Sequence, residues 1–453
     1  MRQRRPIIAT VAASLLLAPV LSVVITPPAQ AAAPAAKPKP ATKASPDYDR
    51  DGKADLAVAV GDSDGTENMA IRIYYGSGRV VDITRHDLKV DDYGLGGPLL
   101  ADDLDGDGYT DLVTASSGRT GAKVHLIPGS ATGLQVPATF SFTVSTKANS
   151  DVSSLALVTS PVRRLAVAVD GREVQLHRLT AAGRPTGTPV TLQPGKGKLP
   201  KLSKNSGFGN LASWGNQLFI GARFAKVNGK ADAGAVVAVT LNASGAKSAR
   251  LITQATKGVG GAVGKEHYFG SRLAARDGYL VVGTPWDKVG KAKQSGSIQL
   301  FSLKDGKLKP VKRITQATPG IPGKAERGDF FGASVAIGRS CKGVPVVLVG
   351  ASNEGIRHDE ADGSAWVIPL RKTKGCPAKQ LWEGHGLPGK PRQQSIGEIT
   401  GFLRDRGAVD DDLVIGGGGS MSEGPLGRLY RVSAKTGKTV LNDQAIYGSA
   451  AGR

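Results

Sequence analysis

The sequence predicts an all-β protein assembled from repeated units, and three observations carry this prediction. The 453 residues include 61 Gly and 26 Pro, whereas aromatic residues make up 5%. This composition is typical of short strands joined by turns and unlike helical bundles. Apolar runs rich in Val, Ile and Ala recur along the chain between glycines. A Phe-Gly pair also returns at an even spacing, at Phe208, Phe269 and Phe331.

The first 31 residues are typical of a secretory signal peptide. A basic start at residues 2–5 precedes an apolar segment from Pro6 to about Ile25 and the small-residue site Ala29-Gln30-Ala31. We expect cleavage after Ala31 and secretion to the extracellular space. An uncleaved membrane anchor is the alternative, because the apolar segment is nearly long enough to span a bilayer. Residues 32–46 are rich in Pro, Ala and Lys and predict an extended linker.

The first unit after the linker begins with an acidic loop, and the second unit repeats it. In the second copy, Asp103, Asp105, Asp107 and Asp111 occupy positions 1, 3, 5 and 9, with glycine at position 6. Alternate carboxylates, a glycine for the sharp turn and the carbonyl of Tyr109 are oxygen ligands suited to Ca²⁺. An apolar strand follows where an EF-hand would have a helix.

The first copy places four carboxylates at the same positions, namely Asp47, Asp49, Asp51 and Asp55. Here too an apolar strand, Leu56–Val60, follows the ninth residue. One such loop can be a solvated turn, but two copies with the same downstream strand indicate calcium. The sequence therefore predicts two structural Ca²⁺ sites.

The later units keep the strand pattern without the acidic loop. Each central unit has a strand that ends in small residues and then a strand that starts with glycine. The pairs of strands are Leu218–Ala222 and Gly234–Val239, Leu280–Pro285 and Gly296–Phe301, and Val346–Ala351 and Gly363–Ile368. The third unit and the last unit are looser versions of the same pattern.

Seven units of about four short strands result, spanning residues 47–453. A unit of this length cannot bury a face alone, and four-stranded units stack radially into a β-propeller. A β-sandwich array is the rival, but it would not repeat one Phe-Gly pattern so evenly. We predict a seven-bladed β-propeller with calcium-binding loops in its first two blades.

These motifs resemble the FG-GAP repeat of integrin α-chain propellers and their bacterial secreted relatives. The resemblance covers residues 47 to about 452 and implies a seven-bladed propeller whose acidic loops join the first two strands of a blade and hold Ca²⁺. It implies that the carbonyl of Lys53 completes the first site, as that of Tyr109 completes the second. The last unit departs from the pattern with Arg404, Arg406 and Ala408 at loop positions 1, 3 and 5. We expect no calcium there or in the fourth to sixth units.

Unit one lacks a first strand, since only the linker and the signal precede its loop. The C-terminal segment 446–452 reads like the opening strand of unit five, Tyr268–Ala274. We therefore predict that the C-terminal strand pairs beside Leu56–Val60 and closes the ring, because a closed ring leaves no inner strand unpaired. A frayed C-terminal tail is the alternative.

The two cysteines, Cys341 and Cys376, predict a disulfide in an exported chain. Two free thiols are the less favoured state. The net charge of +21 favours anionic partners such as wall polymers, or it is simply spread over the surface. No basic run interleaved with aromatic residues supports nucleic acid. We expect a monomer with no stable membrane span after cleavage.

Two classes of function remain after this survey. The sequence favours a secreted, non-catalytic recognition or adhesion module for a cell-wall, glycan or protein ligand, since no catalytic motif is found and no catalytic residue can be assigned. The alternative is an extracellular hydrolase or lyase with its site at the propeller axis. A cluster of charged side chains at one mouth of the axial channel would distinguish the enzyme from the binding module.

Overall fold

A computed structural model describes residues 45–61, 70–90, 94–95, 97–204, 206–356, 362–390, 395–417, 427–444 and 446–451. The chain divides into Met1–Ala41 and Thr42–Arg453. The predicted signal peptide and most of the linker lie outside the described residues. Within the described residues, no helix has both the length and the apolar character needed to cross a membrane.

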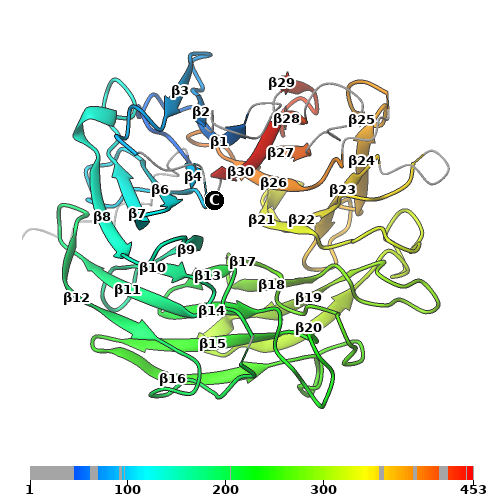
Figure 1. Cartoon of the computed structure of the whole chain (residues 1–453). Coiled ribbons are helices and arrows are strands. Elements are labelled where there is room, and N and C mark those ends of the chain that lie inside the picture. The colour runs from blue at the N-terminus through cyan, green and yellow to red at the C-terminus, as the bar shows by residue number, and fades with distance from the viewer. Residues whose placement is uncertain are drawn as a thin grey trace, which may run out of the picture. The chain divides into compact units, whose positions relative to one another are not determined.

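The described strands of the second unit form seven sheets, antiparallel except for the short parallel pair of β24 and β25, which confirms the seven-bladed propeller (Figure 1). Successive sheets follow one another along the chain, and each is one blade. The first blade contains β1 (Leu56–Gly61), β2 (Ala70–Tyr74) and β3 (Val80–Thr84), the second contains β4 (Gly94–Leu95), β5 (Leu100–Asp102), β6 (Asp111–Gly118), β7 (Gly121–Ile127) and β8 (Phe140–Ser145), and the third contains β9 (Val152–Val158), β10 (Arg164–Val169), β11 (Glu173–Leu179) and β12 (Pro185–Leu192). The fourth blade contains β13 (Leu211–Trp214), β14 (Gln217–Ala222), β15 (Ala235–Asn242) and β16 (Gly245–Ile252), and the fifth contains β17 (Arg272–Arg276), β18 (Tyr279–Thr284), β19 (Ser297–Ser302) and β20 (Lys309–Ile314). The sixth blade contains β21 (Ser334–Ser340), β22 (Val344–Ala351), β23 (Ser364–Pro369), β24 (Lys379–Glu383) and β25 (Gly386–Leu387), and the seventh contains β26 (Ile399–Leu403), β27 (Asp412–Gly417), β28 (Arg428–Val432) and β29 (Thr439–Gln444). The last strand, β30 (Ile446–Ala451), belongs to the first blade.

The hydrophobic core lies between the blades. Seven apolar clusters are found among the described residues, and each draws its side chains from two neighbouring blades. The middle strands are buried on both faces, as in β10, whose six residues are all buried. The outer strands include exposed residues along their length, as in β16. This difference explains why the middle strands read as continuous apolar runs in the sequence.

The recurring glycines form the joints between blades. Gly350 ends the small-residue run of β22, and a side chain there would collide with the carbonyl of Gly397, which belongs to the next blade. Gly363, at the start of the glycine-led strand, pairs with Ile396 of the next blade and has a φ of 78°. The same parallel bridge joins Gly296 to Phe331. The Phe-Gly and Gly-Ala motifs therefore occur together because one blade docks against the other through them.

The ring closes through the C-terminal strand, as predicted. β30 pairs antiparallel with β1, with Ala57 opposite Ala451 and Val60 opposite Tyr447. β30 is the innermost strand of the first blade and lies at the centre of Figure 1 beside β26. A second contact joins the start of the described chain to the last blade, where the backbone of Ser45 pairs with that of Arg404.

The predicted disulfide between Cys341 and Cys376 is present, with the two Cα atoms 5.7 Å apart. It links the turn between β21 and β22 to the connection between β23 and β24. Among the described residues no cysteine is free.

Candidate metal centres and the channel mouth

The two acidic loops occupy equivalent places in the first two blades. Residues 103–111 connect β5 to β6, and residues 47–55 lead into β1. The loops also contact each other, since the Thr110 backbone N–H donates to the carbonyl of Asp47 and the Asp47 N–H donates to Oγ1 of Thr110. This arrangement follows from the tandem repeat, because neighbouring blades present the same turn on the same face of the ring.

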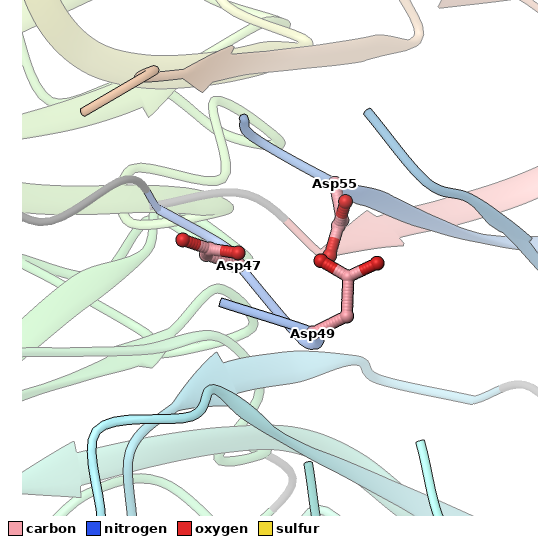
Figure 2. A group of neighbouring side chains, drawn as sticks. All are labelled: Asp47, Asp49 and Asp55. Carbon is pink, nitrogen blue, oxygen red and sulfur yellow. The ribbon is translucent and has the colours of Figure 1, made fainter. Parts of the chain in front are cut away.

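The first loop brings three of its carboxylates together. One oxygen from each of Asp47, Asp49 and Asp55 lies within 4.8 Å of the other two, and Figure 2 shows the Asp49 and Asp55 carboxylates facing each other. The Asp55 carboxylate is fixed by backbone N–H groups of Tyr48, at 2.6 Å, and Gly76, at 2.8 Å. Oδ1 of Asp47 is buried without a hydrogen-bond partner.

The second loop repeats this geometry with Asp103, Asp105 and Asp111. Asp111 accepts backbone N–H groups from Leu104, at 2.7 Å, and Gly129, at 2.9 Å. At the first loop position, Asp103 Oδ2 accepts the Gly108 N–H at 3.2 Å, and Asp47 Oδ2 accepts the Gly52 N–H at the same distance. Two loops of different sequence thus share one hydrogen-bond pattern.

Burial of these carboxylates disfavours their charged form. It raises the pKa of Asp55 to about 7, and the charges of Asp49 and Asp47 add to the effect against the hydrogen bonds that Asp55 accepts. Burial likewise raises the pKa of Asp111 to about 7, with further contributions from Asp105 and Asp107. Three clustered carboxylates with one unpartnered buried oxygen form the kind of oxygen-rich site that suits a hard cation.

Two predicted carboxylate ligands lie outside these groups of three. Asp51 accepts the Lys53 backbone N–H at 2.7 Å, and Asp107 accepts that of Tyr109 at 2.9 Å. Metal ligation by these aspartates, and by the carbonyls of Lys53 and Tyr109, stays a prediction. In the last blade, the guanidinium of Arg404 instead forms an ion pair with the buried Asp411.

A second group of polar and charged side chains lies where the inner strands of the third to fifth blades begin. The inner strands β9, β13 and β17 stand side by side, and a cavity of about 390 Å³ opens where they begin. Its polar lining includes Asp151, Asp170, Asn210, Arg223 and Ser271. The cavity is on the face of the ring opposite the acidic loops, because those loops follow the ends of the inner strands.

Hydrogen bonds hold the Asp170 carboxylate of this cavity in place. Oδ1 of Asp170 accepts the Asp151 backbone N–H at 3.1 Å, and Oδ2 accepts the hydroxyl of the buried Ser150 at 3.1 Å. Asp170 itself has a left-handed backbone with a φ of 53°. Burial, together with the charge of Asp170, raises the pKa of Asp151. A carboxylate of raised pKa in a cavity can exchange protons with a bound reactant.

The sequence analysis did not identify these cavity residues. Asp151 precedes an apolar strand and Asp170-Gly171 lies between two strands, which are ordinary turn positions. Only the ring brings them to Arg223, which belongs to the next blade. An alignment of the repeats would show Arg223 in a loop that follows a second strand, but not what it faces.

Comparisons with known proteins agree with the fold. Residues 47–114, which contain both acidic loops, match the FG-GAP-like repeat family, and this confirms the resemblance to FG-GAP β-propeller repeat proteins. No curated protein matches the sequence. Among solved structures, the periplasmic gluconolactonase of Pseudomonas aeruginosa is 13% identical, with a TM-score of 0.47, over 88% of this chain and 97% of that one. A putative 6-phosphogluconolactonase from Bacteroides uniformis is 12% identical, with a TM-score of 0.50, over 88% of this chain and 99% of that one.

These findings correct the functional prediction. The prediction of a non-catalytic recognition or adhesion module is wrong: the Bacteroides propeller carries the name of a putative lactonase, and this favours the enzyme alternative. At 12% identity the likeness itself establishes the fold alone.

Proposed function

We propose that this seven-bladed propeller, which carries an FG-GAP-like repeat at residues 47–114, is a hydrolase acting on a lactone or ester in the cavity at the starts of its inner strands. The observation that carries the proposal is that Asp151, Asp170 and Arg223 line this one cavity. The name of the Bacteroides propeller supports the reaction class, since a lactonase opens a cyclic ester with water.

The cavity contains the groups that ester hydrolysis needs. Asp151 takes a proton from a water molecule, whose oxygen then attacks the carbonyl carbon. Arg223 stabilises the negative charge that develops on the carbonyl oxygen. The bond to the leaving oxygen breaks and that oxygen receives the proton, so that a lactone and one water give one hydroxy acid. The raised pKa of Asp151 suits this task, because a general base works best near the operating pH.

Hydrolysis of glucono-1,5-lactone and of 4-nitrophenyl acetate tests the proposal. We expect the protein to exceed the buffer rate on the lactone, measured as acid release at constant pH, and Asp151→Asn and Arg223→Gln to lower kcat/KM about a hundredfold. Asp82→Asn is the matched control, since Asp82 forms a salt bridge with Arg72 on an outer strand of the first blade. A wild-type rate equal to buffer on both compounds, or full activity in Asp151→Asn, would contradict the proposal.

We also propose that the two acidic loops hold structural Ca²⁺. Asp47, Asp49 and Asp55 would bind one ion, and Asp103, Asp105 and Asp111 the other. The unpartnered oxygen of Asp47 and the raised pKa values of Asp55 and Asp111 support a cation there, because a positive charge offsets the repulsion among buried carboxylates. The ion would fix the turn between two strands and take no part in hydrolysis.

We place the protein outside the cytoplasm. The Cys341–Cys376 disulfide supports this location, because disulfides persist in oxidising compartments. The basic and apolar pattern of residues 1–31 supports it independently.

A further inference from the structure

Four aromatic rings form a continuous row that begins at the cavity. Phe224 contacts Tyr268, Tyr268 contacts Trp286, and Trp286 contacts Phe330, with ring centroids 5.8, 5.0 and 5.5 Å apart. Phe224 and Trp286 follow the second strands of the fourth and fifth blades. Tyr268 and Phe330 precede the inner strands of the fifth and sixth blades. The row therefore crosses three blades on the face that carries the cavity, and Phe224 lines the cavity itself.

The row is not part of the core. All four rings are half-buried, and none belongs to the apolar clusters between the blades. The neighbouring Phe269 and Phe331, by contrast, are fully buried and join the blades. The row thus leaves apolar ring surface exposed to solvent, although the blades already pack against each other through other residues.

The fold does not require aromatic residues at these positions. Tyr268 and Phe330 have left-handed backbones, with φ of 54° and 58°, and Gly207 and Ser395 fill the same position in the fourth and seventh blades. A bulky side chain is strained in this conformation, whereas glycine is not. A strained bulky residue is a candidate for a functional role when other repeats have a small residue at the same position.

The charges that act on Tyr268, in the middle of the row, are balanced. Asp232 and Glu266 act on Tyr268 with negative charge, while Arg223 and Lys265 act on it with positive charge. Lys265 pairs with Glu266 at 3.0 Å, and Arg223 lies 4.5 Å from the Phe224 ring centroid. A strongly charged polymer gains little electrostatic binding energy from such a surface. An uncharged ligand with apolar faces and hydroxyl edges matches both the rings and the polar groups.

We infer that Phe224, Tyr268, Trp286 and Phe330 bind a neutral oligosaccharide chain and lead it to the cavity. Successive rings are tilted by 88°, 68° and 54°, so the row presents alternating faces and edges. The C–H faces of sugar rings stack on the aromatic faces, and their hydroxyls reach the polar side chains beside them. The substrate class is then an ester or lactone carried on an oligosaccharide. This role in catalysis rests on the hydrolase proposed above, whereas binding is independent of turnover.

Binding is measured without turnover, on the full chain and in the Asp151→Asn background. The probes are cellohexaose, mannohexaose and chitohexaose. Their binding is measured by calorimetry and by the change in the fluorescence of Trp286. We expect one of these sugars to bind and Trp286→Ala to raise its Kd about tenfold. Trp286→Phe should lose the fluorescence change but keep most of the affinity. Trp214→Ala, which alters a tryptophan on β13 outside the row, should bind as the wild type does.

A second variant separates binding from folding. Tyr268→Gly relieves the left-handed strain, so it should melt at or above the wild-type temperature while losing affinity about tenfold. Failure of all three sugars to bind, wild-type affinity in Tyr268→Gly, or tight binding of a proline-rich peptide instead would overturn the inference. Sugar binding without hydrolysis would support the inferred role of the row and refute only the proposed reaction.

Discussion

At the scale of single residues, the acidic loops are arranged by their own backbone. Gly52 and Gly108 donate to Asp47 and Asp103 from equivalent positions. Each hydrogen bond restricts a carboxylate that would otherwise turn toward solvent. The loops therefore hold their carboxylate oxygens close together, and the negative charges of these carboxylates repel one another.

This view yields a prediction for the metal sites. Asp49→Asn and Asp105→Asn keep side-chain shape but remove one charge from each group, so each variant should lose one of the two calcium sites in isothermal titration. Each should also lose part of the rise in Tm that calcium produces, because an ion stabilises only the state that binds it. Asp82→Asn is the control. Absence of calcium uptake by the wild type at millimolar concentration would show that the loops are solvated turns.

At the scale of elements, glycines decide how closely two blades approach. The carbonyl of Gly397 crosses directly over Gly350, and the backbone N–H of Gly332 donates to the carbonyl of Gly350 at 2.9 Å. A methyl group at position 350 would meet backbone atoms, which cannot move aside without shifting a whole strand. The repeated glycine is thus a requirement of blade packing and not of local turn formation.

Gly350→Ala should accordingly destabilise the protein by about 2 kcal/mol, the cost of overpacking a tight contact. The measurement is the midpoint of urea unfolding. Gly401→Ala provides the comparison, because a methyl group there would lie 3.6 Å from the Val414 side chain, an ordinary contact. Its midpoint should stay near that of the wild type. If the two variants unfold at the same urea concentration, the close approach of the blades does not limit stability.

At the scale of the whole ring, the two ends of the described chain fasten the first and last blades. β30 supplies the inner strand of the first blade, and Ser45 pairs with Arg404 of the last blade. Both contacts lie near the first acidic loop, since Asp47 follows Ser45 and Asp55 precedes β1. Closure of the ring and the first acidic loop are therefore mechanically linked.

A chain that ends at Gln444 tests this link. Loss of β30 exposes the edge of β1 and should lower the Tm markedly, with weaker calcium binding at the Asp47 loop than at the Asp103 loop. A chain lacking residues 1–41 serves as the control, because it retains β1, β30 and Ser45. Unchanged melting together with two intact calcium sites in the shortened chain would refute closure by the C-terminal strand.

Much of the fold could be predicted from the sequence because its determinants are local and repeated. Apolar runs predicted the strands, as for Leu165–Val169 within β10, and the even spacing of Phe208, Phe269 and Phe331 predicted the blades. The nine-residue spacing of the acidic loops placed their carboxylates on one turn. The unit without a first strand, beside a C-terminal segment that resembles one, predicted the closure.

The cavity and the aromatic row could not be predicted in this way. Asp151, Asp170 and Arg223 line one cavity only because two blades stand side by side, and Phe224, Tyr268, Trp286 and Phe330 touch across three. The sequence by itself determined the repeat, the strands and the two acidic loops, since each depends on residues close together in the chain. Only the tertiary structure decided which side chains of neighbouring blades come together, because the angle between blades is set by packing over the whole circle.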